Sequence, residues 1–189
     1  MEKEMFETLI GKDEIETRIG ELAAKIDYDY SGEEVVVVPV LKGGMIFACS
    51  LMLELKSTPV VVDYIDVSSY GNNTSSMGEV IPKKWLRDSV CDKNVLIVDD
   101  IIDSGRTLDY IKNRIISEER PKSIKLCTLL NKPSRREFDI EPNYIGFDIE
   151  DVFVAGYGLD YKEHERNKPF IVKVKQFKGC LLYTSDAAD

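Results

Sequence analysis

Two uninterrupted apolar runs dominate the hydrophobic pattern of the chain. Residues 35–40 and 95–98 show no polar alternation, which is typical of strands buried on both faces of a parallel sheet. Shorter apolar or alternating runs, bounded by turn-forming residues, predict further strands. These strands are expected at 59–67, 124–130, 144–147, 152–156 and 170–174.

The sequence also predicts three helices, one ahead of the run 35–40 and two between strands. A first amphipathic helix is expected behind a capping Asp13, before a polar connector over 28–34, with apolar positions at Ile15, Ile19, Leu22 and Ile26. A second, buried helix is expected over 45–55. A third begins near 104–107 and runs to about Ser117, with an apolar face made by Leu108, Ile111, Ile115 and Ile116. This alternation predicts an α/β domain with a right-handed, mostly parallel central sheet flanked by helices.

The run 95–98 stops on two acids, Asp99 and Asp100. Unpaired carboxylates do not stay in a core, so we expect both at the carboxyl end of the strand, where an open α/β sheet presents its ligand crevice. A third acid, Asp103, precedes the Ser-Gly-Arg-Thr segment 104–107, which brings hydroxyls and free N–H groups to the positive end of the third helix. The segment 104–107 is therefore a candidate phosphate-binding site, here called the phosphate cup. Acids that bind hydroxyls or a hard cation, beside this cup, predict a sugar-phosphate site. The simpler alternative is a strand terminus with solvated acids.

Two other loops are candidates for ligand contact. Lys42 and the glycines that follow it come directly after the run 35–40, and glycine lets the backbone approach a ligand closely. An ordinary turn is the alternative for this segment. Residues 68–78 are small, polar and bounded by glycine, and the aromatic Tyr70 within them favours a lid over an idle surface loop.

Composition narrows the class of protein. The chain has 189 residues, 43% of them apolar, and a net charge of −9, which suits one domain and argues against a broad nucleic-acid or anionic-membrane footprint. The single histidine, His164, excludes a histidine-built zinc site. Four cysteines without Cys-x-x-Cys spacing predict reduced thiols, and the acidic N-terminus shows no signal peptide, so a cytoplasmic location is expected.

The end of the chain is set apart from the fold. Residues 180–189 read as the translation of a sequencing-library adapter, so we expect a single domain over 1–179 and an extraneous tail over 180–189. A genuine flexible tail is the alternative.

The stretch 95–108 resembles the phosphoribosyl-pyrophosphate (PRPP) motif of the type I phosphoribosyltransferases. Further segments, over nearly all of residues 1–179, resemble the hypoxanthine-guanine branch of that family. The resemblance implies the family's fold, in which a small hood built from N- and C-terminal segments accompanies the central sheet. Two positions depart from the family pattern, since Asp99 stands where glutamate is frequent and Gly44 where serine is frequent.

The resemblance also implies a role for individual residues. PRPP contacts fall on Asp99, Asp100, Asp103, Ser104, Gly105, Arg106 and Thr107. Pyrophosphate contacts fall on Leu41, Lys42, Gly43 and Arg166, with a cis peptide between Leu41 and Lys42. The lid is Ser68, Ser69, Tyr70 and Gly71. Purine contacts fall on Lys132, Phe153, Val154 and Asp160, and Mg²⁺ ligands on Asp99, Asp100 and Asp160.

The implied reaction transfers ribose 5-phosphate from PRPP to N9 of a 6-oxopurine, with Asp103 as general base, Lys132 at O6 and Phe153 stacked on the base. A homodimer or homotetramer, without nucleic-acid or membrane partners, is expected. The alternatives are a xanthine-preferring enzyme, a nucleic-acid-binding regulator with the same fold, and a phosphoacceptor receiver domain. The receiver domain is disfavoured because its acidic pair belongs on the first strand.

Overall fold

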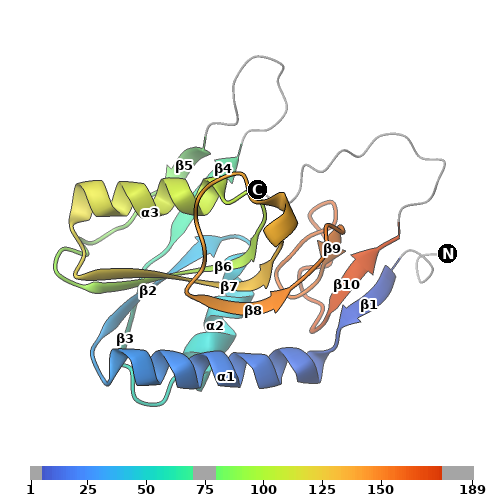
Figure 1. Ribbon diagram of the computed structural model, residues 1–189, viewed down its shortest axis with the longest axis horizontal. Coiled ribbons are helices and arrows are strands. Elements are labelled where there is room, and N and C mark those ends of the chain that lie inside the picture. The colour runs from blue at the N-terminus through green and yellow to red at the C-terminus, as the bar shows by residue number, and fades with distance from the viewer. Residues whose placement is uncertain (1–5, 70–79, 176–189) are drawn as a thin grey trace.

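The computed structural model describes residues 6–69 and 80–175 of the chain. A main sheet carries α1 and α2 on one face and α3 on the other, and a small sheet lies beside it (Figure 1). In the small sheet β1 (Phe6–Ile10) pairs antiparallel with β10 (Ile171–Val174), which pairs antiparallel with β9 (Val154–Ala155). The predicted fold class, with its hood of N- and C-terminal segments, is confirmed.

The main sheet is mostly parallel, as predicted. Its only antiparallel pairing among the described strands joins β4 and β5. The strand order is β5 (Val80–Lys84), β4 (Ile65–Ser69), β2 (Val35–Leu41), β6 (Asn94–Ile102), β7 (Ser123–Asn131) and β8 (Tyr144–Asp148), with β3 (Val60–Val62) also paired to β2.

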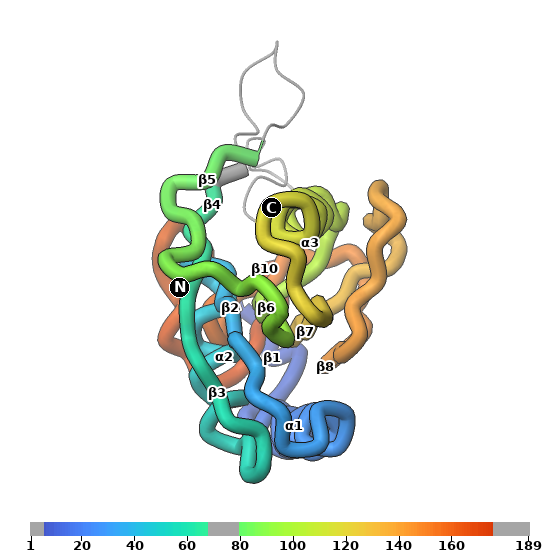
Figure 2. Tube along the Cα trace, turned by 90° about the vertical axis from the view of Figure 1, so that its left-hand side faces the viewer, coloured from blue at the N-terminus to red at the C-terminus, as the bar shows by residue number. Residues whose placement is uncertain are grey.

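The two apolar runs form the centre of this sheet because both of its faces are covered. Alternate residues of β2 and β6 enter different cores: Val37 and Leu96 join the core under α1 (Lys12–Tyr30) and α2 (Gly44–Glu54). Val36 and Ile97 join the core under α3 (Arg106–Glu119). Figure 2 shows α1 and α3 on opposite sides of β6 and β7. A strand buried in this way needs no polar alternation.

The strand β6 is longer than predicted. It continues through Asp99 and Asp100 to Ile102, and all nine of its residues are buried. The expectation that the strand ends at the acidic pair was wrong, because β7 runs beside it to the end and pairs Asp99 with Thr128 and Ile102 with Asn131.

The first helix differs from its prediction at both ends. Gly11 is the N-cap in place of Asp13, and the Gly11 N–H donates to Glu14 Oε2 at 2.9 Å. The helix continues to Tyr30, whose side chain is buried in the core, so the polar connector begins later than predicted.

The other two helices bury narrower faces than predicted. Helix α2 buries Phe47, Ala48 and Leu51, whereas Met45 and Leu53 are exposed, so it is not buried all round. In α3 one residue of the predicted apolar face, Ile116, is exposed, because only Leu108, Ile111 and Ile115 face the sheet. None of the helices in the described ranges is long and apolar enough to cross a membrane.

The observed strands depart from the predicted set in four places. The strand expected at 59–67 is broken into β3 and β4, because the Asp63 carboxylate between them accepts N–H bonds from Tyr64 and Arg87. The strand expected at 152–156 shrinks to β9, and β1 and β5 were not predicted.

Candidate active site

A cavity of about 320 Å³ lies where β2, β6 and the start of α3 meet. The structure brings to it several segments that are far apart in sequence, including Asp66 and Lys83 of β4 and β5. It is lined by Leu41, Lys42, Gly43, Asp99, Asp100, Asp103, Gly105, Thr107, Asp160, Glu163 and Arg166, among others. The predicted PRPP and pyrophosphate residues therefore surround one volume, apart from Ser104 and Arg106, which flank Gly105.

The acidic pair lies at the floor of this cavity. Asp99 and Asp100 are 7% and 9% exposed, and the Asp100 N–H donates to Asp99 Oδ1 at 2.9 Å. Burial, with the neighbouring charge of Asp100 as a further cause, raises the pKa of Asp99 well above its usual range. Burial also raises the pKa of Asp100. Two carboxylates held this deeply favour a cationic or hydroxyl-rich ligand.

The loop after β2, which is predicted to contact pyrophosphate, packs directly on this pair. Leu41 and Lys42 are joined by a cis peptide, as the resemblance implied. A Cβ atom added to Gly43 would lie 1.9 Å from Asp100 Oδ2, and one added to Gly158 would lie 2.2 Å from the Gly43 carbonyl oxygen. Only glycine allows these approaches.

The segment predicted to bind phosphate lies at the N-terminus of α3. Gly105 is the N-cap with φ +88°, and the Arg106 N–H donates to Ser104 Oγ at 3.3 Å. The Thr107 hydroxyl is buried and has no hydrogen-bond partner among the described residues. A buried, unsatisfied hydroxyl on a cavity wall at a helix N-terminus is suited to an anionic ligand.

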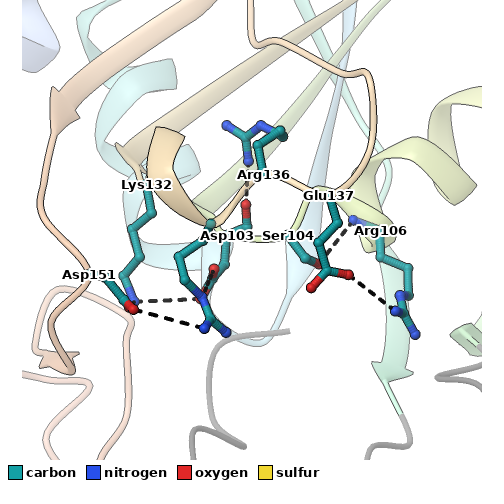
Figure 3. A network of polar contacts seen from close by, with 8 residues as sticks. Asp103, Ser104, Arg106, Lys132, Arg136, Glu137 and Asp151 are labelled. Carbon is teal, nitrogen blue, oxygen red and sulfur yellow. Dashed lines mark hydrogen bonds and ion pairs between the residues drawn. The ribbon is translucent and has the colours of Figure 1, made fainter.

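Asp103 is buried at the far side of the cup, where cations of one loop hold it. Its Oδ1 accepts from Arg135 Nε at 2.9 Å, and its Oδ2 lies 3.5 Å from Lys132 Nζ. Its backbone carbonyl accepts from Arg136. Figure 3 shows Lys132 and Arg136 reaching Asp103 from the loop that follows β7.

The expected pyrophosphate cations are paired with acids. Lys42 Nζ lies 2.9 Å from Glu163 Oε2, and Arg166 lies 2.7 Å from Asp160 and 3.8 Å from Glu163. Sequence reasoning missed Glu163, and it also assigned nothing to Arg135. No local pattern marks Glu163, but the two arginines after Lys132-Pro133 were a visible basic cluster.

Only one of the residues predicted to contact the purine lines the cavity. Asp160 lines the cavity, whereas Lys132, Phe153 and Val154 are not among its lining residues. The Phe153 ring packs edge-to-face on Tyr161 at 5.9 Å, within an apolar cluster on the small sheet. Among the lid residues Ser68 and Ser69 end β4, and Tyr70 and Gly71 lie outside the described residues, as does the tail 180–189.

The donor set suits a hard cation that is shared with a substrate. Within residues 6–69 and 80–175, no three His, Cys, Asp or Glu side chains form a metal cluster by themselves. Mg²⁺ is commonly held through one or two carboxylates plus substrate phosphates, and it takes oxygen ligands. The acidic pair on the cavity floor meets that requirement.

This fold, with an acidic strand and a phosphate cup around one cavity, defines a phosphoribosyltransferase. A family model of the phosphoribosyl transferase domain matches residues 11–162. Hypoxanthine-guanine phosphoribosyltransferase of Bacillus subtilis is 42% identical over 93% of this chain and 96% of its own length. A crystal structure of a hypoxanthine-guanine phosphoribosyltransferase from Bacillus anthracis matches 90% of this chain and 99% of its own, with 44% identity and a TM-score of 0.85. The chain belongs to the hypoxanthine-guanine phosphoribosyltransferase family.

Other relatives are longer. The bifunctional protein TilS/HprT of Listeria monocytogenes is 45% identical over 90% of this chain, which spans only 26% of that protein.

Proposed function

We propose that this chain transfers ribose 5-phosphate from PRPP to N9 of hypoxanthine or guanine and releases pyrophosphate. The observation that carries the proposal is the Thr107 hydroxyl, buried and unpaired among the described residues, on the wall of a cavity whose floor is Asp99 and Asp100. A sugar phosphate satisfies both features, with its phosphate in the cup and its ribose hydroxyls on the acids.

The site residues then have distinct roles in bond making and breaking. The C1′–O bond to pyrophosphate breaks while the N9–C1′ bond forms, so positive charge develops on the ribose and negative charge on the leaving group. Lys42 and Arg166 neutralise the pyrophosphate once they exchange their carboxylate partners for it. Asp103 accepts the proton that the purine loses at N7.

Mg²⁺ is the proposed cofactor, with Asp99, Asp100 and Asp160 as its candidate ligands. When bound, it would neutralise part of the negative charge that develops on the leaving pyrophosphate.

Base choice is proposed to depend on Lys132 and on the small sheet. An ammonium donates and cannot accept, so Lys132 matches the O6 of hypoxanthine or guanine and opposes the 6-amino group of adenine. Backbone carbonyls near Val154 and Asp160 favour guanine over xanthine at C2, and Phe153 stacks on the base after turning from Tyr161.

A steady-state assay with PRPP, Mg²⁺ and four purines tests the activity. Pyrophosphate release with hypoxanthine and guanine, but little with adenine or xanthine, is expected; absence of release with the first two overturns the proposal.

Matched threonine variants test the cup. Both Thr107 and Thr128 carry buried hydroxyls without a hydrogen-bond partner among the described residues, but only Thr107 lines the cavity. Thr107→Val should raise the KM for PRPP by roughly 10- to 100-fold, because it removes a hydrogen bond to a charged group. Thr128→Val should leave this KM unchanged. Equal KM values for the two variants contradict the assignment of the cup.

A further inference from the structure

Both oxygens of the Asp103 carboxylate are engaged by cations from a single loop. Arg135 Nε donates to Oδ1 at 2.9 Å, and Lys132 Nζ lies 3.5 Å from Oδ2. The side chains of Asp103 and Lys132 are 6% and 5% exposed, whereas that of Arg135 is 38% exposed. Lys132 is already the proposed O6 donor, but nothing so far gives Arg135 a role.

The loop that carries both cations is fixed to the PRPP motif by backbone bonds. The Lys132 N–H donates to the Ile102 carbonyl at 3.0 Å, and the Glu137 N–H donates to the Ser104 carbonyl at 2.9 Å. Between these anchors the short helix η2 (Pro133–Arg135) turns the chain back, so that Arg135 faces the same carboxylate as Lys132. Arg135 is therefore held against Asp103 by the fold of the loop.

Arg135 holds Oδ1 of Asp103 and Lys132 lies beside Oδ2, and the second of these pairs matches one edge of a 6-oxopurine. O6 and N7 are neighbouring atoms on that edge, and protein groups read them as an adjacent pair. Lys132 Nζ and Asp103 Oδ2 form an adjacent donor and acceptor at 3.5 Å, which suits O6 and a protonated N7. Arg135 occupies the other oxygen, so the purine need not displace it.

We propose that Arg135 is a positioning residue of the transfer reaction. It acts through Asp103: its guanidinium fixes the rotation of the carboxylate, so that Oδ2 faces the purine. This inference rests on the proposed function. Arg135 touches neither substrate, and its effect should fall on kcat with the KM for PRPP nearly unchanged.

Two variants of Arg135 measure the effect. Arg135→Gln removes the charge and should lower the single-turnover rate with hypoxanthine roughly 10- to 100-fold, the scale of a misplaced reacting group. Arg135→Lys keeps the charge but loses the planar fork, and should recover part of that loss. The unfolding midpoint of each variant is measured alongside, and Arg135→Lys remains informative if Arg135→Gln folds poorly.

A neighbouring acid supplies the matched control. Asp151 lies 3.9 Å from both Lys132 Nζ and Arg135 Nη1 and is not paired with Asp103. If Arg135 acts through Asp103, Asp151→Asn should change the rate by less than about threefold, the range of a weak exposed pair. A loss in Asp151→Asn as large as that in Arg135→Gln would assign the effect to Asp151 and overturn the proposal.

A double-mutant cycle decides between positioning and a general structural role. In an Asp103→Asn background, Arg135→Gln should have less than about a twofold further effect, because its target has gone. A full, additive loss in that background, or no loss in the native background, overturns the proposal. An inactive native protein would refute the proposed function instead, so the two failures are distinguishable.

Discussion

Replacing Gly43 by alanine should disable the site through steric overlap alone. The backbone of Gly43 is in the right-handed helical region (φ −62°, ψ −49°), so alanine introduces no backbone strain. The new Cβ would, however, lie 1.9 Å from Asp100 Oδ2, and such atoms essentially never approach closer than 3.0 Å. The carboxylate must therefore retreat by about 1.1 Å from a buried position.

The displacement sets the expected magnitude. A misplacement of about 1 Å in a reacting constellation can lower the rate about 10²-fold, and overpacking destabilises by about 1–3 kcal/mol. We expect Gly43→Ala to lower kcat/KM for PRPP by that factor in a pyrophosphate-release assay. Chemical denaturation should show the corresponding loss of stability.

Two further variants separate the causes. Gly20→Ala lies within α1, where an added Cβ has no neighbour within 4 Å, so it should stabilise the protein by up to about 1 kcal/mol without changing activity. Asp100→Ala in the Gly43→Ala protein should restore stability but not activity. A Gly43→Ala protein within twofold of native kcat/KM would refute the steric reasoning.

Three other predictions follow from contacts already described. Asp103→Asn should lower kcat roughly 10²- to 10⁴-fold with PRPP affinity intact, and an unchanged single-turnover rate would remove Asp103 as the base. Lys132→Ala should erode discrimination against adenine, measured as kcat/KM for the four bases; efficient use of adenine by the native protein would contradict its role. The Tyr144 hydroxyl donates to Asp29 at 2.7 Å and lowers the pKa of that carboxyl from its ordinary 3.8. Because the folded pKa is the lower one, this stabilisation is present above pH 3.8 and is lost as the pH falls through the folded value. Tyr144→Phe should therefore cost about 1 kcal/mol at pH 7 and less in acid, as measured by urea denaturation; a pH-independent difference would argue against this pairing.

Much of the fold and part of the site were predictable because their signals are local. The apolar runs of β2 and β6 are covered on both faces, so their composition alone identifies them. The start of α3 at Gly105 and Arg106 was equally predictable, since its signals lie within its own residues. The cis peptide before Lys42 came from the family resemblance and from no physical pattern.

The features that escaped prediction depend on distant partners. Glu163 meets Lys42 from another part of the chain, and Arg135 finds Asp103 only through the turn of η2. The strands β1 and β9 are short and obtain their pairing from β10. At the start of α1 the sequence offered Asp13 as a cap, and Gly11 with Glu14 took that place.

The pairing of β1 with β10 has a consequence for biosynthesis. Phe6 faces Val174 in that ladder, so β1 waits for a partner made roughly 170 residues later, or on the order of 10–30 s at usual rates of synthesis. The main sheet, with Asp99 and the phosphate cup, is complete once β8 has emerged. The small sheet, which carries Val154, can close only afterwards. The nascent chain should therefore form the strand that carries Asp99 and Asp100 and the start of α3 before the small sheet closes.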